Sequence, residues 1–228
     1  MGTDKATLAW GSTTLAERAA AVLASVVEPV LEVGPGRSGL VVVREDPPGR
    51  GPLAALAAGW AALTGAAAGR PGLGGRLLGG PGGADDDPPQ GVVVLACDLP
   101  LVGVPLLAWL ADHPAPGSVV PLAGDPAQPQ PLCARWADHD LAALDRFLAA
   151  GVRSLRPLVA RPGVVRAPAE DWLAFAGPAG RRAFDDADTP AQLRDLAALA
   201  DLADLADLSG LPGPVGDPDR PADRPSAP

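Results

Sequence analysis

The chain contains very few of the side chains that usually carry recognisable chemistry. Its 228 residues include no tyrosine, one methionine, two histidines and two cysteines, and aromatic residues make up 4%. The cysteines, Cys97 and Cys133, are far apart and do not have the spacing of zinc ligands, so we expect two buried free thiols. The sequence has no apolar run long enough to span a bilayer and no signal-peptide pattern. We therefore expect a soluble, cytoplasmic protein that does not bind membranes.

Lysine is almost absent as well. Lys5 is the only lysine, and arginine supplies all the other basic side chains. The excess of arginine, alanine, glycine and proline is typical of genomic base bias, under which arginine serves wherever a general positive charge is enough. The surviving lysine indicates a position that needs a compact ammonium group rather than a planar guanidinium. Chance survival is the alternative.

Negative charge is concentrated near the carboxyl end. The formal net charge is −9, and from Asp185 onward ten acidic residues are accompanied by only three arginines. The rest of the chain is close to neutral. This distribution argues against a nucleic-acid-binding surface, which is basic.

Helical and strand patterns alternate along the chain. Apolar spacing predicts helices over 15–26, 51–63, 104–111, 140–150, 153–160 and 190–208, and strands over 26–33, 40–43, 91–97, 119–122 and 164–166. This alternation predicts a doubly wound, Rossmann-like α/β fold with a mostly parallel sheet. We expect one domain over 1–208 with a flexible loop insertion at 69–90, followed by a disordered Pro/Gly/Asp-rich tail over 209–228.

Two acidic residues follow predicted strands, where such sheets bind their ligands. Asp98 ends the apolar run 91–97, and a carboxylate there is costly to bury unless it is paired. It is a candidate Mg²⁺ ligand, and capping of the next helix is the alternative. Asp46 follows the strand over 40–43, and its carboxylate could accept two hydrogen bonds from a guanine edge. An Asp-Pro turn is the alternative for Asp46.

A third acidic group comes late in the chain. In FDDADTP (184–190), Asp186 and Asp188 occupy alternate positions, so they face the same way if the segment is extended. Capping of the helix that begins at Pro190 is an alternative role for Asp188 or Thr189.

Five segments in order resemble the MobA-like nucleotidyltransferases, and within them most closely the molybdenum cofactor guanylyltransferases. They are MGTDK, ED…GRGPLAAL, ACDLP, QPLCA and FDDADTPAQL, and the resemblance covers most of residues 1–200. It implies a fold of the nucleotide-diphospho-sugar transferase type and transfer of GMP from GTP to the phosphate of molybdopterin or the molybdenum cofactor. Mg²⁺ would be the cofactor, and proteins that deliver or accept the molybdenum cofactor would be transient partners. The alternatives are a relative that uses CTP or another acceptor, and a truncated, inactive nucleotide-binding protein.

The resemblance also assigns roles to single residues. Lys5 would contact the nucleotide phosphates, Asp46 the guanine base, and Asp98 both Mg²⁺ and phosphate, with Asp188 as a further metal ligand. Asp186 and Asp188 stand where guanylyltransferases commonly carry asparagine. The full nucleotide-binding set that it implies is Lys5, Glu32, Asp46, Gly51, Pro52, Leu53 and Asp98.

The first motif is matched only in its second half. In the family a strand and a Leu-Ala-Gly-Gly segment precede the residues that correspond to Met1, Gly2, Asp4 and Lys5. We therefore expect the native protein to start upstream of Met1, with the first strand absent from this sequence. Neighbouring strands would then lack a partner, and the chain as given would fold poorly and bind GTP weakly.

Overall fold

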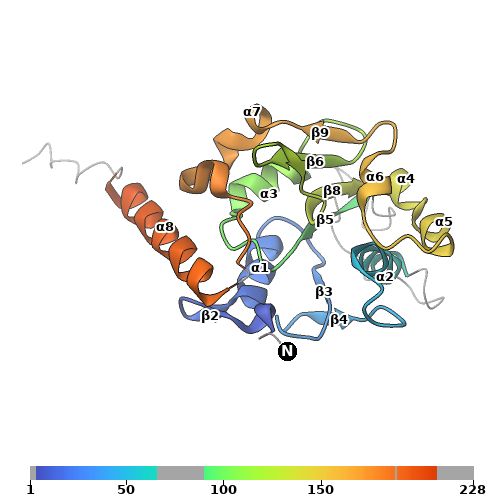
Figure 1. The fold of residues 1–228 in the computed structure, drawn as a ribbon, viewed down its shortest axis with the longest axis horizontal. Helices are drawn as coiled ribbons and strands as arrows, with labels where there is room; N and C mark the ends of the chain where they lie inside the picture. The colour runs from blue at the N-terminus through green and yellow to red at the C-terminus, as the bar shows by residue number, and fades with distance from the viewer. Residues whose placement is uncertain (1–3, 66–89, 188, 210–228) are drawn as a thin grey trace, which may run out of the picture.

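The computed structural model describes residues 4–65, 90–187 and 189–209 (Figure 1). The sequence predictions for Met1, Gly2 and Asp188 lie outside the described residues. The same is true of nearly all of the loop expected at 69–90 and of the tail expected at 209–228.

A mixed sheet of five strands forms the centre of the fold. The strand order is β5–β8–β6–β7, and β9 pairs with β6. Within this sheet β9 runs parallel to β6, whereas β8 is antiparallel to both β5 and β6, and β7 is antiparallel to β6. The bounds are β5 (Gly91–Leu95), β6 (Val119–Ala123), β7 (Gln128–Pro129), β8 (Cys133–Ala137) and β9 (Val165–Ala167).

The expectation of an α/β fold is confirmed, but the expectation of a mostly parallel sheet is wrong for this sheet. The difference is β8, which the sequence patterns did not predict. It pairs with β5 over its whole length, from Gly91 opposite Ala137 to Leu95 opposite Cys133. Its two alanines and Arg135 have little intrinsic preference for a strand, so pairing and burial between two neighbours decide this conformation.

Helices cover both faces of this sheet (Figure 1). Because side chains alternate along a strand, Val93 packs in one apolar cluster and Val92 and Val94 pack against another. The first cluster contains residues of α3 (Val104–Ala111) and α7 (Ala169–Trp172), with α1 (Leu15–Ala24) packed against it. The second contains residues of α2 (Pro52–Thr64), α4 (Asp138–Leu141), α5 (Leu144–Ala149) and α6 (Arg156–Val159).

The amino-terminal part adds two small sheets. A short 3₁₀ helix, η1 (Lys5–Thr7), leads into the hairpin β1 (Ala9–Trp10) and β2 (Thr13–Thr14), and β3 (Leu31–Val33) pairs in parallel with β4 (Val41–Val43). The strand predicted over 26–33 is shorter than expected. The helix predicted over 140–150 is divided into α4 and α5.

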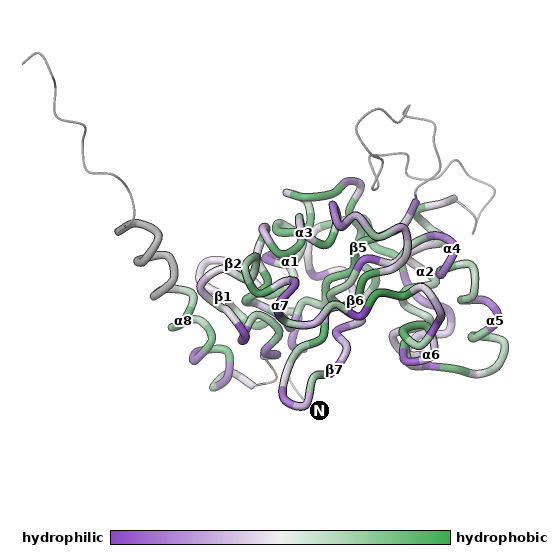
Figure 2. Tube along the Cα trace, turned by 90° about the horizontal axis from the view of Figure 1, so that it is seen from above, coloured by the Kyte–Doolittle hydropathy of each residue, from purple (hydrophilic) through white to green (hydrophobic). Residues whose placement is uncertain are grey.

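The carboxyl-terminal helix packs against residues of the amino-terminal part of the chain. After η2 (Leu173–Phe175) and η3 (Gly177–Arg182), α8 (Pro190–Ser209) packs Leu193 and Leu196 in a cluster with Leu15 and Leu101. Figure 2 shows the mixture of polar and apolar residues along the first part of α8. Among the described residues, no helix has the length and apolar character needed to cross a membrane.

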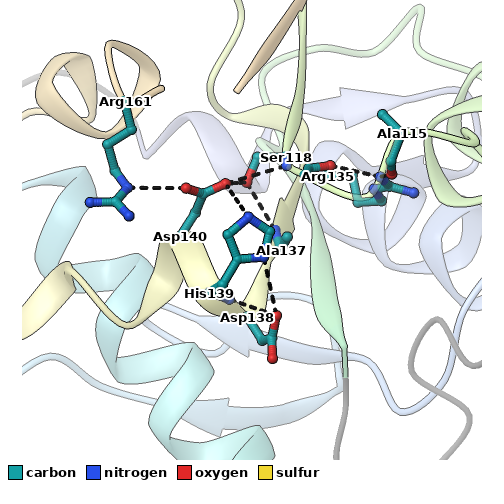
Figure 3. Close-up of polar contacts among 9 residues, drawn as sticks. Ala115, Ser118, Arg135, Ala137, Asp138, His139, Asp140 and Arg161 are labelled. Carbon is teal, nitrogen blue, oxygen red and sulfur yellow. Dashed lines mark hydrogen bonds and ion pairs between the residues drawn. The ribbon is translucent and has the colours of Figure 1, made fainter. Parts of the chain in front are cut away.

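A buried carboxylate links the sheet to two of its covering helices (Figure 3). Asp140, whose side chain is fully buried, accepts hydrogen bonds from the Ser118 hydroxyl at 2.7 Å and from the Arg161 guanidinium at 3.0 Å. The Ser118 hydroxyl in turn accepts from the Ala137 N–H at 2.9 Å. Burial alone would raise the pKa of the Asp140 carboxyl, but these bonds outweigh burial and hold its pKa below the ordinary value.

Candidate active site

Asp98 lies where the strongest predicted strand ends. It is half-buried, three residues beyond the end of β5. Its backbone carbonyl accepts a hydrogen bond from the Ala187 N–H at 2.9 Å, so the late FDDAD segment is joined to this point. The alternative role of Asp98 as the cap of α3 is wrong, because the residue at that N-cap is Gly103.

Two roles were predicted for the late segment 184–190, metal binding and capping of the helix that follows it. Thr189 caps α8, since its hydroxyl accepts a hydrogen bond from the Gln192 N–H at 3.2 Å. Asp186 is exposed to solvent, one residue before the Ala187 amide that bonds to Asp98. Asp186 therefore belongs to the surroundings of Asp98. The role of Asp188 stays a prediction, because this residue is outside the described part of the chain.

The amino-terminal segment reaches the same region. Burial raises the pKa of the Cys97 thiol, and the carboxylates of Asp98, Asp4 and Glu32 raise it further. Three acidic side chains, from η1, β3 and the end of β5, are therefore close enough to act on one thiol. Lys5, half-buried, directly follows Asp4, so its backbone lies at the edge of this acidic region.

Asp4 and Arg37 tie the amino-terminal segment to the loop after β3. The Arg37 guanidinium contacts the Asp4 carboxylate at 3.0 Å, with both side chains partly exposed. The same Asp4 carboxylate accepts a hydrogen bond from the Ala6 N–H at 3.2 Å, which fixes the start of η1. This pair positions the segment that contains Lys5.

Glu32 organises the loop that follows β3. Its carboxylate accepts hydrogen bonds from the backbone N–H groups of Gly36, Arg37 and Ser38 at 2.7, 2.7 and 2.8 Å, and from the Ser38 hydroxyl at 2.7 Å. Partial burial would raise the pKa of Glu32, but these four bonds outweigh it and lower that pKa. In this structure, Glu32 holds a loop beside Asp98, and its direct contact with a nucleotide stays a prediction.

The expected base-binding segment is a separate loop between β4 and α2. Asp46 is exposed there and is not among the described residues that line a cavity with Glu32 and Asp98. The neighbouring Glu45 carboxylate accepts hydrogen bonds from the N–H groups of Gly49 and Arg50, both at 3.1 Å. Glu45, which the sequence analysis did not select, therefore shapes the loop that presents Asp46.

Gly51, Pro52 and Leu53 join this loop to the protein core. Gly51 has a φ of +97°, and a Cβ added there would lie 2.9 Å from the Arg153 carbonyl oxygen, so only glycine fits without a shift. The same carbonyl accepts from the Leu53 N–H at 3.1 Å, and the Arg153 guanidinium donates to the Gly49 carbonyl at 2.6 Å. Pro52, at the first turn of α2, lines the cavity that Glu32 and Asp98 line.

The donor set around Asp98 agrees with the way Mg²⁺ is held at phosphate-transfer sites. No group of three or more histidine, cysteine, aspartate or glutamate side chains that could hold a metal ion is found in residues 4–65, 90–187 and 189–209. Mg²⁺ needs fewer protein ligands, because it is usually bound by one or two carboxylates together with substrate phosphates and water. The single half-buried carboxylate of Asp98 is compatible with that mode, and a ligand role for Asp188 stays a prediction.

A family model shows the family of this chain, and two solved structures show its fold. A family model described as the MobA-like NTP transferase domain matches residues 1–165. The structure is similar to that of molybdopterin-guanine dinucleotide biosynthesis protein A from Archaeoglobus fulgidus, with a TM-score of 0.63 and 20% identity, covering 88% of this chain and 92% of that one. It also resembles a protein of Aquifex aeolicus, with a TM-score of 0.54 and 13% identity, covering 77% and 79%. None of the curated proteins compared with the chain matches it significantly.

Proposed function

Since the chain belongs to the family of MobA-like NTP transferase domains, we propose that it transfers GMP from GTP to the terminal phosphate of molybdopterin, with or without bound molybdenum. The observation that carries the proposal is that η1, which holds Lys5, meets Glu32 and Asp98 in the lining of one cavity. The likeness to a molybdopterin-guanine dinucleotide biosynthesis protein supports the choice of substrates.

The proposed step is a displacement at phosphorus. An oxygen of the molybdopterin phosphate forms a bond to the α-phosphorus of GTP, and the bond to the bridging α–β oxygen breaks. Pyrophosphate leaves with the electron pair of that bond. The attacking phosphate is already ionised at neutral pH, so no side chain has to remove a proton. The protein contributes chiefly by holding the two anions in position and by offsetting their charge.

Each residue of the site has a role in this step. Lys5 binds the nucleotide phosphates and stabilises the charge that develops on the leaving pyrophosphate. Asp98, with Asp188 as a further candidate, would hold Mg²⁺, which would supply charge neutralisation and alignment of the phosphates. Glu32 and the Asp4–Arg37 pair fix the two segments beside Asp98. Asp46 accepts hydrogen bonds from the guanine edge on the loop that Glu45 shapes.

The lone lysine gives a first test. Lys5→Arg keeps the charge but replaces a compact ammonium with a larger planar group, so we expect kcat/KM to fall on the order of tenfold or more. The reverse exchange at an exposed arginine of β9, Arg166→Lys, is the control and should have a small effect, because this side chain is outside the candidate site. Equal kcat/KM values for Lys5→Arg and the wild type would show that the lysine is an accident of composition.

Nucleotide choice gives a second test. If Asp46 binds guanine, Asp46→Ala should weaken GTP binding by about ten- to a hundredfold, since a charge-assisted hydrogen bond contributes about 1.5–3 kcal/mol. Binding of ATP and CTP should hardly change. Asp125→Ala is the control, because Asp125 is also exposed and also precedes a proline. Titration with all four nucleotides checks the prediction, and equal weakening for every nucleotide would show that Asp46 has a structural role only.

A further inference from the structure

The corner between α5 and α6 contacts the loop that carries Asp46. Arg153 lies in this corner, and its guanidinium donates a hydrogen bond to the Gly49 carbonyl at 2.6 Å. Its own backbone carbonyl accepts a hydrogen bond from the Leu53 N–H at 3.1 Å. Figure 1 shows α2, α5 and α6 together at one end of the molecule. A single residue therefore holds both the loop 45–51 and the first turn of α2.

The backbone of Gly49 is held from both sides. Its N–H donates to the Glu45 carboxylate at 3.1 Å, and its carbonyl accepts from the Arg153 guanidinium. The Glu45 carboxylate also accepts a hydrogen bond from the Arg50 N–H at 3.1 Å. The loop is thus closed by an acidic side chain from its own start and by a basic side chain from a distant corner. Asp46 directly follows Glu45, so these bonds fix the backbone that presents it.

The corner that holds Arg153 is itself well anchored. Past the end of α5, the Val152 N–H donates to the Phe147 carbonyl at 3.0 Å and so closes the last turn of that helix. Leu155 is buried in the apolar cluster that also contains Leu53. The backbone of Arg153 is fixed between these anchored neighbours, and its exposed side chain reaches the loop from a stable base.

We propose that Arg153 is a positioning residue for nucleotide selection, which holds the loop 45–51 so that Asp46 is in place for the guanine base. The inference rests on the proposed role of Asp46 in binding guanine. A loop that is ordered before the nucleotide arrives loses less conformational freedom on binding, so the affinity is higher. Arg153 acts through Gly49 and Asp46 and does not contact the nucleotide itself.

Steady-state release of pyrophosphate, with molybdopterin and Mg²⁺, gives the first test. Arg153→Met removes the donor and keeps most of the side-chain length, so we expect KM for GTP to rise roughly three- to tenfold, as for the loss of one hydrogen bond. The value of kcat should stay within about twofold of the wild type, because the groups around the phosphates are unchanged. Arg153→Lys should recover most of the lost affinity, since one donor serves the bond to Gly49. Arg156→Met, at an exposed arginine of α6, is the control for the loss of one positive charge and should change neither constant.

Two further measurements separate positioning from direct contact. The double variant Asp46→Ala/Arg153→Met should bind GTP no more weakly than Asp46→Ala alone, because Arg153 acts through Asp46. Amide exchange at Gly49 and Arg50, recorded without nucleotide, should be several-fold faster in Arg153→Met than in the wild type. Exchange at Leu53 should not change, because its N–H is bonded to the backbone of Arg153 and not to the side chain.

The possible outcomes distinguish this inference from the proposed function. Additive loss of GTP affinity in the double variant would mean that Arg153 binds the nucleotide itself, and unchanged exchange at Gly49 and Arg50 would mean that it does not hold the loop. A fall in kcat with KM unchanged would indicate a general structural role. Each of these results overturns the inference and leaves the proposed function standing. If Asp46→Ala weakens the binding of all four nucleotides equally, the guanine-binding role of Asp46 is wrong and the positioning role fails with it.

Discussion

Asp98→Asn is expected to lower kcat about 100- to 1,000-fold, the effect of removing one group that stabilises developing charge. Asparagine keeps the shape of the side chain but loses the negative charge that Mg²⁺ and its bound phosphates require. The backbone bond from Ala187 to the Asp98 carbonyl does not depend on the side chain, so the fold should remain intact. Steady-state release of pyrophosphate from GTP, in the presence of molybdopterin and Mg²⁺, measures the effect.

A surface acid provides the matched control for Asp98. Asp112 is exposed at the carboxyl end of α3, and Asp112→Asn should leave kcat within about twofold of the wild type, as expected for a surface change away from the site. The melting temperature of both variants should be recorded, so that a loss of activity can be separated from a loss of folded protein. Near-normal, Mg²⁺-dependent turnover by Asp98→Asn would remove Asp98 from the site.

Asp140→Ala is expected to lower the free energy of unfolding by about 3 kcal/mol, because it leaves the Arg161 charge and the Ser118 hydroxyl without their partner. We choose the lower end of the range for buried ion pairs because the Arg161 side chain is 25% exposed. Urea unfolding measures the change, and Asp145→Ala, an exposed acid in α5, is the control. A change below about 1 kcal/mol for Asp140→Ala, as for an exposed ion pair, would mean that the buried network contributes little.

The same carboxylate predicts a dependence of stability on pH. The pKa of Asp140 is lowered in the folded state, so its contribution is complete above the ordinary aspartate value of about 3.9. That contribution is lost as the pH falls through the lower pKa of the folded state. The stability difference between the wild type and Asp140→Asn should therefore be constant near pH 7 and shrink below about pH 4. A difference that stays constant from pH 7 to pH 3 would contradict this.

The apolar run before Asp98 was enough to predict β5, and the alternation of patterns was enough to predict the α/β class. Neither pattern predicted β8, because its alanines and Arg135 have little intrinsic preference for a strand. Arg135 is accommodated because its guanidinium donates to the carbonyls of His113, Ala115 and Gly117, which the sheet and the preceding loop bring to it. These hydrogen-bond partners are brought together by the tertiary structure, so the local sequence does not predict them.

In the candidate site too, residues with a local sequence signal could be selected, whereas residues that act through distant partners could not. Asp98 was selected from its place after an apolar strand and Lys5 from being the only lysine, and their roles stay predictions. Arg153 could not be recognised, since its bond to Gly49 joins residues 104 positions apart. An acid followed by a glycine-rich turn, as in ED…GRG, was the one local signal that could have selected Glu45. Glu32 was selected, but its four loop contacts were not foreseen.

Transfer of the nucleotide is the most direct test of the central claim. The chain would be incubated with Mg²⁺, molybdopterin and each of the four nucleoside triphosphates in turn. We expect pyrophosphate release from GTP that requires molybdopterin and equals the amount of guanine dinucleotide formed, with release from CTP at least tenfold slower. Preference for CTP, or no acceptor-dependent release of pyrophosphate from GTP, would contradict the proposed function.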